Sequence, residues 1–144
     1  MEATLYDQDF YQWALKNAEL MRQGKLSEVD LENVAEELES MGRSERRQLE
    51  NRLISLIMHL LKWQFQPERQ SRSWKSTINA QRRGIERLLK ASPSLKPMFS
   101  EVINEAYPYA TRDFEDETEI SRKKLPRECP YTPEQVMNED FWPE

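Results

Sequence analysis

The sequence predicts an all-α protein, a compact bundle of about five helices followed by a proline-rich, largely irregular C-terminal arm. Apolar residues recur at spacings of three and four along most of the chain, which is the period of an α-helix. No stretch of useful length alternates apolar and polar residues as a half-buried strand does. Four of the eight prolines fall after residue 121. We therefore expect a helical bundle domain over residues 1–120 and an arm over residues 121–144 that packs on the bundle or trails from it.

The first two expected helices have recognisable start and stop signals. Asp7 or Asp9 can cap a first helix, which Gly24 ends. Ser27 and Asp30 resemble a capping box at the start of the second, which runs to the next glycine.

The third expected helix, over residues 44–66, is the most apolar and should lie at the centre of the bundle. Gly42 precedes it and leaves an alternative open, because the second and third helices can instead be one long helix kinked at this glycine. The side chains expected to be almost fully buried are Leu53, Leu56, Ile57 and Leu60.

Serine and proline mark the remaining elements. Ser73 can cap a fourth helix that ends at Ser92, and Ser94 can cap a fifth. Pro108 should kink or end this fifth helix, although residues 110–120 could resume it. Within the arm, a single helical turn is expected over residues 133–138.

Composition excludes several classes of protein. The single Cys129 cannot form an internal disulfide, and with one histidine it cannot build a Cys/His zinc site. Three glycines cannot form a glycine-rich phosphate loop. The start of the chain lacks the pattern of a signal peptide, and no apolar run is long enough to cross a membrane. We expect a cytoplasmic protein with no metal, no cofactor and no membrane association.

Charge divides the chain into three blocks. Residues 1–50 have a net charge of -6, residues 51–96 a net charge of +8, and residues 97–144 a net charge of -7. In one interpretation, acidic helices pack beside the basic block and neutralise it. In the other, the segment 62–87 presents a positive surface to an acidic protein or a nucleic acid.

The second interpretation predicts a binding or adaptor module. Trp63 and Trp74 lie among the cations of this segment, as in proteins that hold single-stranded nucleic acid, but both also fall on apolar stripes that suit a core. A helical wheel places Lys75, Arg82 and Arg83 on the exposed side of the fourth helix. The predicted binding residues are Arg69, Arg72, Lys75, Arg82 and Arg83.

Arg52 and His59 suggest an alternative, an enzyme. They are seven residues apart, about two helical turns, and so project from nearly the same face. The pair resembles the Arg–His motif of HEPN-type helical ribonucleases, which act at the seam of a dimer. A metal-independent ribonuclease would use His59 for proton transfer and Arg52 to hold phosphate, and it would make the protein a homodimer. The other interpretation places His59 at the edge of the apolar face, in a hydrogen bond.

Several short motifs together resemble one known family. They are Tyr6-Asp7-Gln8-Asp9-Phe10, Trp13, His59-Leu60-Leu61-Lys62-Trp63, Gln66-Pro67, Arg72-Ser73-Trp74, Thr77-Ile78-Asn79-Ala80-Gln81-Arg82, Ser92-Pro93-Ser94-Leu95 and Cys129-Pro130-Tyr131. In this combination the chain resembles, over essentially its whole length, the mainly cyanobacterial domain-of-unknown-function family 29. The resemblance implies a small helical fold in a bacterial cytosol. It implies no catalytic residues, since the family has none established.

Overall fold

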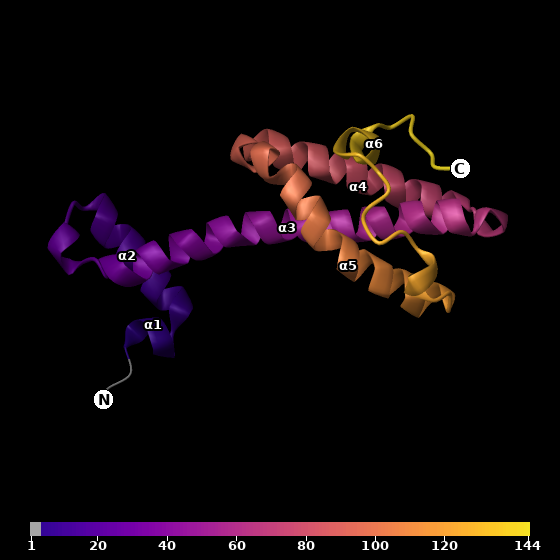
Figure 1. The fold of residues 1–144 in the computed structure, drawn as a ribbon. Helices are drawn as coiled ribbons and strands as arrows, with labels where there is room; N and C mark the ends of the chain where they lie inside the picture. Colours follow the sequence, from indigo (N-terminus) through magenta and orange to yellow (C-terminus); the bar gives the residue numbers. More distant parts are fainter. Residues whose placement is uncertain (1–3) are drawn as a thin grey trace. The chain divides into compact units, whose positions relative to one another are not determined.

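The computed structural model describes residues 4–144, and within that range it contains helices and no strand (Figure 1). The α-helices are α1 (Leu5–Gln8), α2 (Phe10–Arg22), α3 (Leu31–Phe65), α4 (Arg72–Ala91), α5 (Phe99–Thr118) and α6 (Pro133–Met137). The short 3-10 helices are η1 (Leu26–Glu28), η2 (Pro67–Arg69), η3 (Pro93–Met98) and η4 (Arg122–Lys124). The predicted all-α class is confirmed. In the described part of the chain, every helix is too short or too polar to cross a membrane.

The described residues form two compact units, residues 4–44 and residues 45–144. Helix α3 belongs to both, because its first turns lie in the first unit and the rest of it lies in the second. Residues 121–144, the predicted arm, belong to the second unit.

The first unit is held by a cluster of polar and aromatic side chains at the start of α3. The buried Trp13 indole donates to the Asp30 carboxylate at 3.0 Å, and the Asn17 side chain accepts from the Asp30 backbone N–H at 2.8 Å. The Asp30 carboxylate also accepts from the backbone N–H and the side-chain amide of Asn33, and in this way Asp30 caps α3. Asp9 accepts from the Gln12 N–H and caps α2, so this predicted cap is confirmed.

Helix α3 runs through Gly42 from Leu31 to Phe65, so the expected second and third helices are one long helix, the part of the alternative that is confirmed. The Arg43 guanidinium forms ion pairs with Glu36 at 3.1 Å and Glu39 at 3.8 Å, and these pairs bridge the glycine on the helix surface. Gly24 differs, because its φ of 74° lies in the left-handed region and ends α2.

These two glycines predict opposite effects of alanine. Gly42→Ala should stabilise the protein by about 0.5–1 kcal/mol, because a Cβ there meets nothing within 4 Å and alanine favours the helix. Gly24→Ala should destabilise it by about 1 kcal/mol, because alanine resists a positive φ. Urea unfolding followed by far-UV circular dichroism measures both changes. Two shifts in the same direction would contradict this account.

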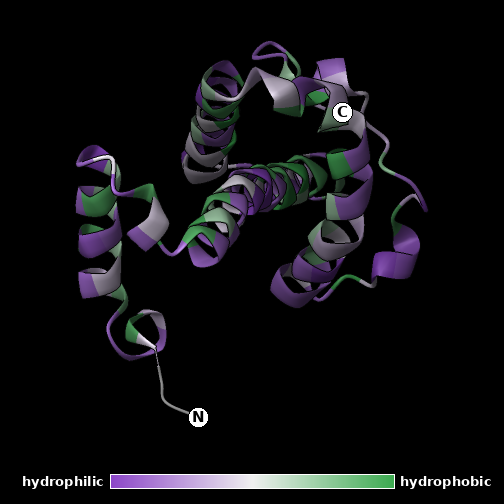
Figure 2. Ribbon diagram, turned by 90° about the vertical axis from the view of Figure 1, so that its left-hand side faces the viewer, coloured by the Kyte–Doolittle hydropathy of each residue, from purple (hydrophilic) through white to green (hydrophobic). Residues whose placement is uncertain are grey.

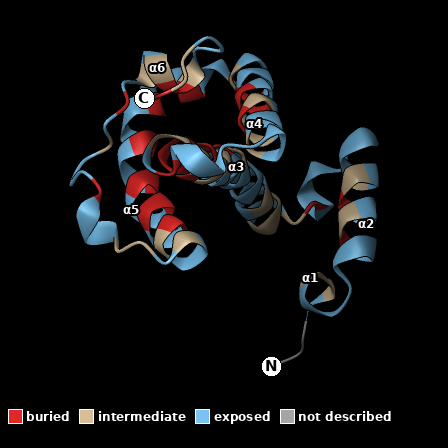
Figure 3. Cartoon of the chain, turned by 90° about the vertical axis from the view of Figure 1, so that its right-hand side faces the viewer, coloured by how far each residue is buried: buried red, intermediate tan, exposed pale blue. Residues whose placement is uncertain are grey.

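The second unit is built around the C-terminal half of α3, which α4 and α5 flank (Figure 1). Figure 2 shows hydrophobic residues concentrated on this part of α3, and Figure 3 shows buried residues there and on α5. The predicted core residues Leu53, Leu56, Ile57 and Leu60 are all fully buried, at 0 % exposure. The central place of the third expected helix is therefore confirmed.

Several boundaries differ from the sequence-based expectations. Ser27 lies in η1, and Asp30 alone caps α3. Helix α5 begins at Phe99, after η3, without the expected cap from Ser94. Ser71, not Ser73, caps α4, because its extended backbone places its hydroxyl to accept the Trp74 N–H at 3.2 Å. Pro108 lies inside α5, which continues to Thr118, so of the two expectations at this proline the one in which the helix ends is wrong. The buried face on both sides of the proline, from Val102 to Phe114, packs into the core and holds the helix together.

The end of the chain packs against the helices of the second unit. Helix α6 forms at the predicted single turn, with a reciprocal capping box between Thr132 and Gln135, and it contacts both α4 and α5. The Tyr131 hydroxyl donates to Gln64 at 2.8 Å, and Val136 is fully buried. We call residues 131–144 the C-terminal segment.

Candidate functional site

One side of α4 carries a row of exposed cations. We call Arg72, Lys75, Arg83, Arg87 and Lys90 the α4 cationic face; all five are exposed. At 1.5 Å per residue the row extends about 27 Å, and four of its members, without Lys75, fall within a narrow stripe of the helical wheel. Arg69 in η2 is also exposed and precedes the first turn of α4. Glu86 is the single acidic residue in α4.

Direct ion pairs do not neutralise this face. Across residues 4–144, no salt bridge includes a member of the α4 cationic face or Arg69. In the segment 62–87, the cation that is paired is the buried Lys62, whose ammonium lies 3.2 Å from Glu117. The Lys75 ammonium lies 5.7 Å from the centre of the Trp142 ring, a cation–π contact inside the chain. The other four members of the α4 cationic face keep their charge free for an external group.

Arg82 corrects the helical-wheel prediction that it is exposed. Its side chain is 1 % exposed and donates to three backbone carbonyls of the C-terminal segment, those of Val136 at 2.8 Å, Gln135 at 3.2 Å and Phe141 at 3.0 Å. The C-terminal segment covers the side of α4 that the wheel left open. Arg82 therefore anchors the segment rather than forming part of the α4 cationic face.

Arg82 is almost fully buried, and the cavity that it lines also includes Glu86, Glu139 and Asp140. Burial lowers the pKa of its guanidinium, while the nearby Glu139 carboxylate acts in the opposite direction. The guanidinium lies 5.5 Å from the centre of the Trp142 ring, a cation–π contact. Its Nη1 is buried and has no hydrogen-bond partner within the described residues. Three charge-assisted hydrogen bonds and the ring offset the cost of burying this charge.

The tryptophans of the segment are engaged inside the fold. Trp63 packs on Trp142 with ring centres 4.7 Å apart, and the Lys62 ammonium lies 4.7 Å from the centre of the Trp74 ring. Both Trp63 and Trp74 are half-buried. Both rings therefore already make a contact within the fold, which competes with their use for stacking on nucleic-acid bases.

Arg52 and His59 make separate contacts. The half-buried Arg52 guanidinium donates to the Gln81 side chain at 3.1 Å and lies against Gly84, where an added Cβ would meet it. His59 Nδ1 donates to the Ser55 carbonyl at 2.7 Å, so Nε2 is the free ring nitrogen of the neutral form. Burial lowers the pKa of His59, which favours the neutral form at pH 7. Within residues 4–144, no hydrogen bond joins the two side chains.

A second group of cations lies elsewhere in the same unit and was not predicted from the sequence. Arg112 of α5 and residues Arg122, Lys123 and Arg127 line one cavity of about 450 Å³. The signal available in the sequence is the basic run at residues 122–124 with Arg127. This basic run lies within residues 97–144, whose net charge is -7, so the charge of the whole block gives no sign of a local basic cluster.

The described residues form a small all-helical protein whose helix α4 carries exposed cations, and no group of three or more His, Cys, Asp or Glu residues among them could hold a metal ion. Residues 5–142 match the family model "Domain of unknown function DUF29", and the chain belongs to this family. The resemblance drawn from the motifs is thereby confirmed. No curated protein and no solved structure matches the chain.

Proposed function

We propose that this protein is a binding module whose α4 cationic face docks an acidic segment of a protein partner. The observation that carries the proposal is the row of five exposed cations on one helix, without an ion pair in the described chain. Placing like charges along one face costs repulsion, which an acidic partner relieves.

An acidic protein fits these observations better than a nucleic acid does. Proteins that bind single strands without base readout stack bases on aromatic side chains, and here Trp63 and Trp74 pack against other parts of the fold. The chain as a whole carries a net charge of -5, which opposes the approach of a long polyanion. A short acidic segment meets less of this repulsion.

The C-terminal segment supports the same proposal. Helix α6 packs against α4. From residue 131 onward the segment has no basic residue and four acidic residues, which are Glu134, Glu139, Asp140 and Glu144. Helix α4 thus already accommodates an acidic stretch of its own chain beside the exposed row.

Titration of a labelled poly-glutamate peptide at two salt concentrations tests this function. Wild-type protein should bind, and the affinity should fall steeply with salt because the contacts are exposed charge pairs. Replacing Arg72, Arg83 and Arg87 together by glutamine should weaken binding by about tenfold or more and flatten the salt dependence.

A matched control separates the α4 cationic face from net charge. Lys16, Arg22 and Lys25 are exposed cations of the first unit, and replacing all three by glutamine changes the net charge by the same amount. This control should bind poly-glutamate like wild type; an equal loss in both variants would contradict the proposal. Tighter binding of single-stranded RNA would favour a nucleic-acid partner. Cleavage of RNA by the wild-type protein without added metal, together with loss of cleavage in His59→Ala, would favour the ribonuclease hypothesis.

A further inference from the structure

The cavity between α5 and the segment after it is formed by a reversal of the chain. Glu119 ends α5 with a φ of 63°, and the following residues return along the helix. The Tyr107 hydroxyl donates to the Pro126 carbonyl at 2.7 Å, and the Glu115 carboxylate accepts from the Arg122 N–H at 2.8 Å. These two contacts fix residues 122–126 against α5, with Leu125 buried between them and the helix.

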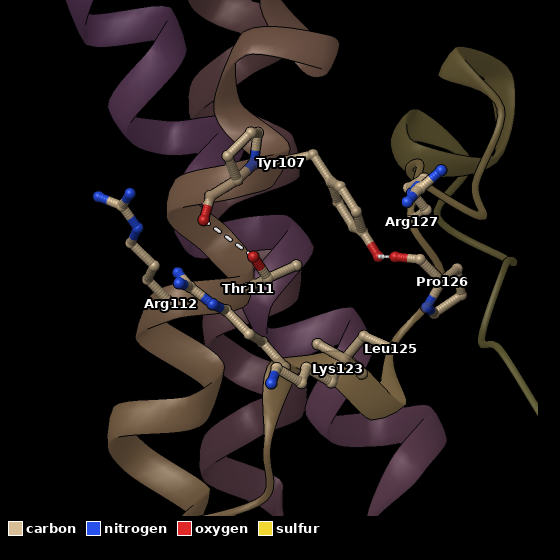
Figure 4. A pocket seen from close by; sticks show the side chains of 9 residues that line it. Tyr107, Thr111, Arg112, Lys123, Leu125, Pro126 and Arg127 are labelled. Carbon is tan, nitrogen blue, oxygen red and sulfur yellow. Dashed lines mark hydrogen bonds between the residues drawn. The ribbon is translucent and has the colours of Figure 1, made fainter.

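Four cations line this cavity (Figure 4). Arg112 comes from α5, while Arg122, Lys123 and Arg127 come from the returning segment. None of the described residues that line the cavity is acidic, and none of the four cations forms a salt bridge in residues 4–144. We call these four side chains the cation pocket.

The other polar groups of the wall are already bonded. The Thr111 hydroxyl donates to the Pro108 carbonyl at 2.8 Å, and the Tyr107 hydroxyl donates to Pro126, as Figure 4 shows. The N–H groups available to a ligand are therefore those of the cation pocket. A neighbouring cavity that shares Tyr107, Pro108 and Arg127 includes Glu128, so the excess of positive charge is particular to the first cavity.

Four unpaired cations around one cavity favour a ligand with several negative charges. Arginine binds phosphate with two parallel hydrogen bonds, and lysine adds a point charge. A volume of about 450 Å³ is in the range of small-molecule sites. We propose that the cation pocket binds a small ligand that carries a phosphoryl or pyrophosphoryl group.

Isothermal titration calorimetry with pyrophosphate as the probe tests this inference. Wild-type protein should bind pyrophosphate, and more tightly than citrate, which carries carboxylates instead. The double replacement Arg112→Gln and Arg127→Gln should weaken pyrophosphate binding by about tenfold or more, as loss of charge-assisted hydrogen bonds implies. All four side chains of the pocket are exposed, so the variants should fold, which a melting curve checks. Arg122→Gln with Lys123→Gln is a second pair and should weaken binding in the same way.

The control replaces two exposed cations of the first unit, Arg22→Gln and Lys25→Gln, with the same change in net charge. This control should bind pyrophosphate within about twofold of wild type. No binding by wild type, an equal loss in the control, or equal affinity for citrate would each overturn the inference. Poly-glutamate binding is measured separately at the α4 cationic face, so failure at the cation pocket is distinguishable from failure of the proposed function.

Discussion

Replacing Arg82 by methionine should destabilise the protein by about 3–5 kcal/mol and release the C-terminal segment from α4. Methionine keeps an unbranched chain but is shorter than arginine and has no donor, so the carbonyls of Gln135, Val136 and Phe141 lose their shared partner. Removing one side of a buried, charge-assisted contact leaves the other side without compensation. Urea unfolding measures the loss of stability, and tryptophan fluorescence reports the change around Trp142.

Arg83→Met is the matched control, since Arg83 is the next residue of the same helix but is exposed and makes no ion pair in the described chain. Its effect should stay within about 0.5 kcal/mol. If Arg82→Met changed stability as little as this control, the C-terminal segment would be held by its apolar contacts alone, such as Trp63 with Trp142.

Leu56→Ala should cost about 2–5 kcal/mol, because it leaves a cavity in the most buried part of the second unit. Leu56 is 0 % exposed and lies on α3 between α4 and α5, where neighbouring side chains have little freedom to refill the space. The shift in the midpoint of urea unfolding measures this cost.

Leu38→Ala provides the comparison on the same helix. Leu38 is 62 % exposed, so its truncation should change stability by less than about 0.5 kcal/mol. Equal losses of stability in Leu56→Ala and Leu38→Ala would contradict the central place of the C-terminal half of α3 in the core.

The periodic apolar pattern was sufficient to predict the helices and the core. Leu53, Leu56, Ile57 and Leu60 repeat at helical spacing, and burial of such a face dominates the stability of a helix. The sequence does not decide whether α3 continues through Gly42, because an exposed glycine in a helix costs only about 1 kcal/mol and the exposed ion pairs around it contribute a similarly small amount.

The exposure of the basic side chains was harder to predict from the sequence. Arg82 and Arg83 are adjacent and chemically identical, yet one is buried and the other exposed. The difference comes from backbone carbonyls more than fifty residues away, and every residue has a carbonyl, so no sequence signal marks those acceptors. The cation pocket could not be predicted from the sequence for a related reason. Arg112 joins Arg122 and Arg127 only because α5 ends in a left-handed residue that turns the chain back.

The contact between Arg82 and the Val136 carbonyl also has a kinetic consequence. The two residues are 54 positions apart, and closing a loop of that length costs about 3.5 kcal/mol of chain entropy beyond a constant. Contacts within α3 and α4 are local and carry no such cost. The C-terminal segment should therefore dock after the transition state for folding of the second unit. Strengthening its contacts then lengthens the lifetime of the native state and leaves the folding rate nearly unchanged.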